Sequence, residues 1–199
     1  MKEFMSWRKL RTDLPRRTSQ GLKSLSMKKN NPEKLVKSAT RVKKFAEVYT
    51  PSWLVKKMLD LLPDDDTHKF SWMSATVLEP SCGNGNFLVE ILRRKLAFAK
   101  KTEDLLIAIK SIYGIDLLPD NVVEAKSRMF DIINSSGIPF PEMEVWTILN
   151  LNIQQGDFLS GKKANGNPVL IFNWKTNTAR SLNELRNKPG RDFSQGELF

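Results

Sequence analysis

The stretch "VLEPSCGNGNFLVEILRRKL", residues 77–96, has the pattern of a strand, a tight glycine turn and a helix. Its first part is short and apolar, as expected of a buried strand, and its last part repeats apolar residues at helical spacing. Between them, Gly83 and Gly85 give the backbone conformations that other residues adopt only at a cost. In parallel sheets, ligands bind beside such turns at the carboxyl ends of strands. The stretch therefore predicts a ligand site.

Strands and helices alternate after this turn. Apolar runs at 111–116 and 168–173 predict two further strands and residues 151–157 predict another, while residues 119–136 predict a helix that begins at Pro119. This alternation is typical of a parallel sheet with helices on its faces. We therefore expect an α/β fold, with a mostly parallel sheet, helices on both faces and truncation of the sheet after the fourth strand.

The positive charge lies almost entirely before the turn. Residues 1–44 contain 14 Lys and Arg against 3 acidic residues, whereas the remaining chain contains 18 against 19. Such a block attracts phosphate through counterion release and predicts binding to DNA or RNA. A solubilising or partner-binding tail is the alternative. We expect a basic arm at 1–44, a ligand-binding domain at 45–175 and a C-terminal tail at 176–199.

Composition limits the class of protein. The single cysteine, Cys82, excludes an intramolecular disulfide and is typical of a reducing compartment. No apolar run approaches the roughly 20 residues that a membrane span needs. We expect a soluble cytoplasmic protein with no membrane partner.

The residues around the glycine turn restrict the ligand. A dinucleotide site has three glycines in the spacing G-x-G-x-x-G, but Leu88 occupies the third position here. Glu79, at the end of the strand, would also repel a pyrophosphate. A nucleoside that carries a positive group fits these residues better, and a purely structural tight turn is the alternative.

Four segments together resemble a known family. They are "EVYTPSWLVKKMLDLL", "VLEPSCGNGNFLVEIL", "IYGIDLLPDNV" and "NIQQGDFL". Their order and spacing are similar to the cofactor motifs of N6-adenine DNA methyltransferases of the restriction-modification type, over about residues 45 to 159. The resemblance implies a Rossmann-like methyltransferase fold and S-adenosylmethionine as the cofactor.

The resemblance also implies roles for residues before and within the turn. Residues 49–51 would close over the methionine end of the cofactor, and the Glu79 carboxylate would face the methionine amino group. The remaining matches would form the turn itself. The residues matched in this part are Tyr49, Thr50, Pro51, Glu79, Pro80, Ser81, Gly83, Asn84, Gly85 and Phe87.

Further matches lie at the ends of the next two strands. Asp116 would accept hydrogen bonds from both ribose hydroxyls, and Leu117 would pack on the adenine ring. Asp157 and Phe158 would bind the adenine amino group and stack on its face. Cys82 stands where a small residue is wanted, and its interpretation is structural.

The catalytic motif of the family, Asn-Pro-Pro-aromatic, should follow the fourth strand. In this sequence Asn173 and Trp174 supply an amide and an aromatic ring without the two prolines. They form either a contracted catalytic motif, which would bind a flipped base, or a strand end with a packed tryptophan.

The chain has little length after Asn173 for reading a DNA sequence in the grooves. If the protein methylates DNA, recognition would come from the basic arm, from a recognition subunit, or hardly at all. A sheet that ends after four strands would also expose an edge, which favours a partner or a homo-oligomer that covers it. The last residues, "QGELF" (195–199), resemble the short peptides that dock on bacterial sliding clamps, although Gly196 replaces an apolar residue. A frayed terminus is the alternative.

These observations predict an S-adenosylmethionine-dependent DNA adenine-N6 methyltransferase, or the cofactor-binding subunit of one. The alternative is a catalytically inactive, methyltransferase-like accessory protein that binds nucleic acid or is recruited by a clamp.

Overall fold

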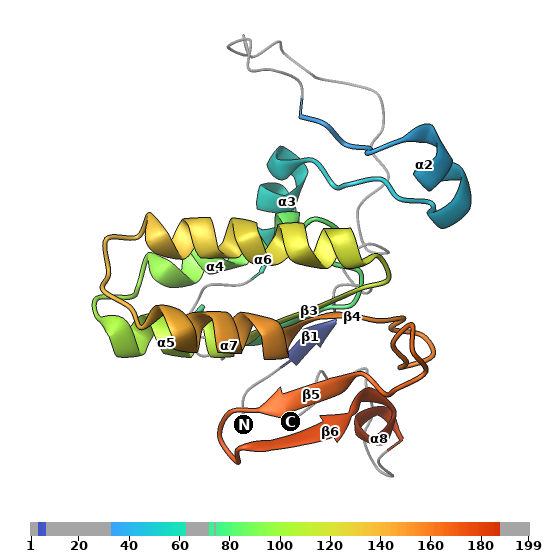
Figure 1. The fold of residues 1–199 in the computed structure, drawn as a ribbon. Helices are drawn as coiled ribbons and strands as arrows, with labels where there is room; N and C mark the ends of the chain where they lie inside the picture. Colours follow the sequence, from blue (N-terminus) through green and yellow to red (C-terminus); the bar gives the residue numbers. More distant parts are fainter. Residues whose placement is uncertain (1–3, 7–32, 63–71, 74, 188–199) are drawn as a thin grey trace, which may run out of the picture.

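The structure is a computed structural model that describes residues 4–6, 33–62, 72–73 and 75–187 (Figure 1). The described part is a mixed α/β structure. None of its helices has the length and apolar character needed to cross a bilayer. The elements follow in the order β1 (Phe4–Ser6), α2 (Ala39–Phe45), α3 (Ser52–Leu59), β2 (Thr76–Glu79), α4 (Asn86–Leu96), α5 (Thr102–Lys110), β3 (Ile112–Asp116), α6 (Pro119–Asn134), α7 (Glu142–Asn152), β4 (Ile153–Gln155), β5 (Leu170–Asn173), β6 (Thr178–Ser181) and α8 (Leu182–Arg186).

The main sheet is parallel, as the alternation of strands and helices predicts. Among the described residues its strand order is β1-β2-β3-β4. Glu79 pairs with Gly114, and Asp116 pairs with Gln155, so the carboxyl ends of β2 and β3 reach the same edge of the sheet. Strand β1 comes from the predicted basic arm, so residues 4–6 of that arm belong to the sheet.

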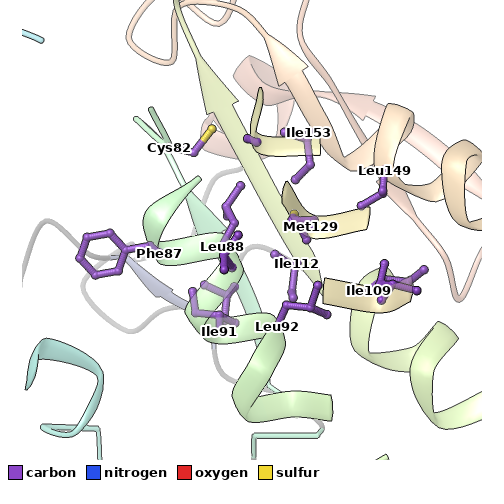
Figure 2. Close-up of a cluster of buried hydrophobic side chains, with 14 of the residues drawn as sticks. Cys82, Phe87, Leu88, Ile91, Leu92, Ile109, Ile112, Met129, Leu149 and Ile153 are labelled. Carbon is purple, nitrogen blue, oxygen red and sulfur yellow. The ribbon is translucent and has the colours of Figure 1, made fainter. Parts of the chain in front are cut away.

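The two faces of the sheet pack against different layers. Side chains alternate across a strand, so neighbouring residues enter different clusters. Val77, Ile112 and Ile153 face the helices, whereas Leu78 and Tyr113 face the other side. Figure 2 shows the helical side, where side chains of α4, α5, α6 and α7 surround Ile112 and Ile153; the labelled residues include Leu88, Leu92, Ile109, Met129 and Leu149.

The fourth predicted strand forms, but it does not join the main sheet. Residues 168–173 were expected to extend the parallel sheet, but β5 pairs antiparallel with β6 in a separate two-stranded sheet. A parallel neighbour requires a crossover connection, usually a helix, and the chain between β4 and β5 contains turns and bridges instead. The hairpin therefore folds back onto the main sheet (Figure 1).

The hairpin and the short helix α8 cover the second face of the sheet. Val169, Ile171, Leu182 and Leu185 pack there as fully or nearly fully buried side chains. Each contributes on the order of 2 kcal/mol of hydrophobic free energy. Helices were expected on both faces of the sheet. Helices α4–α7 cover one face as expected, but on the other face the hairpin replaces most of the helical layer.

Candidate ligand-binding site at the glycine turn

A cavity of about 180 Å³ opens at the carboxyl ends of the strands of the main sheet. Three segments that are distant in sequence enclose it: the chain before α3, the glycine turn after β2, and the start of α6 after β3. In an open parallel sheet, ligands bind at the carboxyl ends of the strands. Its lining residues are Phe45, Ala46, Glu47, Val48, Tyr49, Thr50, Ser81, Cys82, Gly83, Asn84, Asn86, Phe87, Asp116, Leu117, Leu118 and Asn121.

The glycine turn is specified by two left-handed residues. Gly83 has φ +52° and Gly85 has φ +89°, values that side-chain-bearing residues rarely adopt. Gly85 is also the N-cap of α4, and a Cβ there would lie 2.9 Å from the Cβ of Ala125. The missing side chain at Gly85 therefore lets α4 begin directly against α6.

Asp116 joins the glycine turn to the start of α6. Its Oδ2 accepts a hydrogen bond from the Gly83 amide at 2.8 Å. Its Oδ1 accepts one from the Leu118 amide at 2.9 Å and one from Asn121 Nδ2 at 3.1 Å. Asp116 is buried, and these donors satisfy its charge without a cation. The carboxylate is thus held at a fixed position in the cavity wall.

Tyr49 covers the turn from the opposite side. A Cβ on Gly83 would lie 3.2 Å from the Tyr49 ring, so the ring lies directly on the turn. The Tyr49 hydroxyl donates to Asn121 Oδ1 at 2.8 Å, and burial raises the pKa of Tyr49 to about 12. The neighbouring Thr50 carbonyl accepts from Asn86 Nδ2 at 2.8 Å. Residues 49 and 50 are therefore anchored at both α6 and α4.

The segment 33–51, here called the cover segment, is held on α6 by ion pairs. Arg41 pairs with Glu47 at 2.5 Å within the segment and with Asp120 at 2.6 Å on α6. Lys37 pairs with Asp120 and with Glu124, both at 2.8 Å. Residues 33–44, expected within the arm, thus share contacts with the predicted ligand-binding domain.

These contacts keep the carboxylates ionised. Hydrogen bonds from Arg41 and then Lys37 hold the pKa of Asp120 well below its ordinary value. Burial by itself would raise the pKa of Glu47, but hydrogen bonds from Arg41, Asn121 and Tyr49 lower it. A carboxylate with a lowered pKa stabilises the folded state above its ordinary pKa and loses this effect as the pH falls through the folded value. Mild acid therefore leaves the cover segment in place, whereas salt weakens it.

We expect Arg41→Gln to loosen the cover segment. The substitution removes the guanidinium from two carboxylates, an effect of about 1 to 2 kcal/mol for partly buried pairs. Amide hydrogen exchange in residues 45–50 should become about tenfold faster, including at the Tyr49 amide, which donates to the Leu35 carbonyl at 2.7 Å. Salt at 0.5 M, a concentration at which the screening length is about 4 Å, should accelerate exchange in the wild type more than in the variant.

Lys43→Gln is the matched control, because Lys43 is an exposed cation on the same helix. Exchange at residues 45–50 should be unchanged in it. Equal exchange rates in both variants and the wild type would show that the ion pairs do not hold the cover segment.

The structure gathers most of the predicted cofactor residues around the cavity. Pro51, Pro80 and Gly85 are adjacent to the lining in sequence but are not part of it, and Glu79 is buried beneath the turn, 3.4 Å from the Ser81 amide. Those that line the cavity are Tyr49, Thr50, Ser81, Gly83, Asn84, Phe87, Asp116 and Leu117.

Asp157 and Phe158 do not join this group. Asp157 Oδ1 accepts from the Leu159 amide at 2.8 Å and thereby caps its own turn. Hydrogen bonds from Ser160 and then the Leu159 amide lower the pKa of Asp157. The Phe158 ring packs under the Arg186 guanidinium, 4.0 Å from the ring centroid, on the hairpin side of the sheet. Their predicted contacts with an adenine ring therefore have no counterpart on the cavity wall.

Asn173 and Trp174 do not line the cavity, which argues against the contracted catalytic motif and favours the alternative, a strand end with a packed tryptophan. Trp174 Nε1 donates to Asn152 Oδ1 at 2.9 Å, and Asn152 Nδ2 donates to the carbonyl of Ile112, the first residue of β3. Asn173 Oδ1 accepts from the amides of Lys175 and Thr176 and closes the hairpin turn. The chain after β5 thus lies beside the amino-terminal end of β3, whereas the cavity lies beyond its carboxyl-terminal end.

Sequence reasoning missed several residues of the site. Glu47 and Asn121 are central, because Asn121 Nδ2 donates to both Glu47 and Asp116 and so links the cover segment to the turn. The start of α6 follows Asp116 by only a few residues, which was the available signal for Asn121. Phe45 carried no such signal, because it precedes the first recognised motif, and Val48 lies inside that motif but matches none of its cofactor residues.

Other predicted features are structural or lie elsewhere. Burial, with the nearby carboxylates of Asp116 and Glu79, raises the pKa of the Cys82 thiol and keeps it neutral. No group of three or more potential metal ligands occurs within the described ranges. The clamp-like tail 195–199 and residues 7–32 of the basic arm lie outside the described residues.

No family model, no curated protein and no solved structure matches this chain. The site is therefore interpreted from its own residues.

Proposed function

We propose that the chain binds S-adenosylmethionine at the glycine turn and acts as the cofactor-binding subunit of a DNA adenine-N6 methyltransferase with a Rossmann-like fold. One observation carries this proposal: Asp116, Gly83 and Tyr49 meet in one cavity at the carboxyl edge of the sheet. A strand-end carboxylate beside a glycine turn is suited to ribose hydroxyls.

The charges of the site support a cationic cofactor. Asp116 lines the cavity and Glu79 is buried beneath the turn, whereas the charge of Glu47 is paired with Arg41. A sulfonium and an ammonium group would be attracted to Asp116 and Glu79, whereas a phosphate chain would be repelled. The residues present therefore fit S-adenosylmethionine, which would supply the transferable methyl group when bound. In this assignment the protein's own residues hold the ribose and cover the cofactor.

We expect calorimetric titration of the full chain to show binding of S-adenosylmethionine at least about tenfold tighter than binding of ATP, a preference of about 1.4 kcal/mol. Both ligands contain adenosine, so the difference reports the charge of the remaining group. S-adenosylhomocysteine, which lacks the sulfonium, should bind with an affinity between those of S-adenosylmethionine and ATP. Tighter binding of ATP, or no binding of S-adenosylmethionine by the folded protein, would refute the assignment.

The position of Asn173 and Trp174 favours a subunit over a complete enzyme. Neither residue lies at the cavity, so the groups that orient the target base would come from a partner. The second candidate, a catalytically inactive accessory protein that binds nucleic acid, rests on the same displacement and on the basic arm. Transfer of a labelled methyl group to mixed-sequence DNA by the chain alone would contradict both candidates and indicate a complete enzyme.

A further inference from the structure

The mouth of the cavity carries three large apolar side chains that are open to solvent. The exposed fraction is 39% for Phe45, 59% for Val48 and 49% for Leu117. All three line the cavity, the first two from the cover segment and the third from the turn after β3. Apolar groups gathered at a cavity mouth are typical of a surface that a ligand or partner covers.

The interior of the same cavity is polar. Asp116 and Asn121 are buried there, and the Tyr49 hydroxyl donates to Asn121 at 2.8 Å. A ligand that suits both parts has a polar group for the interior and an apolar surface for the mouth. A nucleoside has this division, because its sugar carries hydroxyls and the faces of its base are apolar.

Phe45 and Val48 lie in the part of the cover segment that is held on α6. Glu47, between them in the sequence, accepts from Asn121 at 2.6 Å at the start of α6. Leu117 and Leu118 immediately precede α6. Thr50, by contrast, is bound to Asn86 at the start of α4. The cover segment thus runs from the end of β3 towards the end of β2, and Phe45, Val48 and Leu117 line the same cavity.

The cover segment also supplies an aromatic ring at the cavity. The Phe158 ring is packed with Arg186 on the hairpin side. Among the aromatic residues of the cavity lining, Tyr49 and Phe87 are buried in the surrounding protein, with exposed fractions of 6% and 5%. Phe45 presents the largest exposed ring, and the Lys44 ammonium lies 5.2 Å from its centroid.

We infer that Phe45 and Val48, together with Leu117, form the contact surface for the base of the bound nucleoside. This inference rests on the proposed function and adds two binding residues to it. The cover segment then has two roles: it closes the cavity through its ion pairs, and it supplies the apolar wall on which the base packs.

The inference is tested by titrating adenosine and S-adenosylmethionine into Phe45→Ala and Val48→Ala. Each substitution removes apolar contact area with the base, so we expect each to weaken both ligands by about five- to thirtyfold, equivalent to about 1 to 2 kcal/mol. The factor should be the same for both ligands, because both carry the same base.

Val123→Ala is the matched control. Val123 is 67% exposed on α6 and does not line the cavity. It should change the affinity for adenosine by less than about twofold, as expected for an exposed side chain that contacts no ligand. Circular dichroism and thermal unfolding check that every variant is folded, and Val48→Ser, which keeps a small exposed side chain, replaces Val48→Ala if that variant is not.

The outcomes separate this inference from the proposed function. If the wild type binds adenosine and the Phe45 and Val48 variants bind it equally well, the contact surface is wrong and the cofactor assignment stands. If the folded wild type binds neither ligand, the proposed function fails and the inference fails with it.

Discussion

Asp116→Ala is expected to abolish cofactor binding and to destabilise the protein. The substitution removes the acceptor of three hydrogen bonds, from the Gly83 amide, the Leu118 amide and Asn121. Two lost ribose contacts, each about 1.5 kcal/mol or more to a charged acceptor, correspond to at least about a hundredfold loss of affinity. The donors left without an acceptor should lower the free energy of unfolding by about 3 kcal/mol.

Calorimetry with S-adenosylmethionine and urea unfolding measure the two effects. Asp116→Asn separates them in part, because it keeps one acceptor oxygen but places the NH2 donor of its amide group opposite the Gly83 amide, which is also a donor. It should lose most of the affinity and less of the stability. Asp131→Ala, at an exposed position on α6, is the control and should retain both. Unchanged affinity in Asp116→Ala would remove the central residue of the proposed site.

Gly85→Ala is expected to have the largest effect on stability of any single methyl addition in the glycine turn. At φ +89° an alanine adopts the left-handed conformation at a cost of about 1 to 2 kcal/mol. Its Cβ would also lie 2.9 Å from the Cβ and 3.0 Å from the Cα of Ala125, which forces α4 and α6 apart at a further cost of about 1 to 3 kcal/mol. We therefore expect a total loss of about 3 kcal/mol in urea unfolding.

Gly137→Ala isolates the packing contribution. Gly137 has φ +74°, but a Cβ there would have no atom within 4 Å. It should lose only the conformational part, about 1 kcal/mol. If both variants lose the same stability, close contact between α4 and α6 does not constrain the turn. A selective loss in Gly85→Ala should also weaken S-adenosylmethionine, because α4 begins beside the cavity.

Local patterns in the sequence were sufficient to predict the central strands of the sheet. Short apolar runs identified β2 and β3, because a strand buried on both faces needs continuous apolar residues. Strand β4, Ile153–Gln155, contains only one apolar residue. The helix α7, Glu142–Asn152, was missed. It begins after Pro141 without a side-chain cap, and it joins β4 directly with no turn residue between them. A helix without an end signal is difficult to separate from the strand that follows it.

The sequence predicted those parts of the candidate site that lie at the ends of strands. Gly83, Gly85 and Asp116 lie at strand ends, and parallel pairing of β2 with β3 brings strand ends together whatever the rest of the chain does. Phe45 and Val48 belong to the site only because ion pairs hold the cover segment on α6. Such pairs join residues about 80 positions apart, and no periodicity records them.

The sequence by itself thus determined the α/β alternation, the parallel core and the position of the glycine turn, because each follows from the preferences of neighbouring residues. Only the tertiary structure decided the direction of β5, and with it the place of Asn173 and Trp174. A strand of four residues can pair on either side and in either direction. The choice depends on which apolar surface remains uncovered, and here that surface was the second face of the sheet, at Leu78, Tyr113 and Ile115.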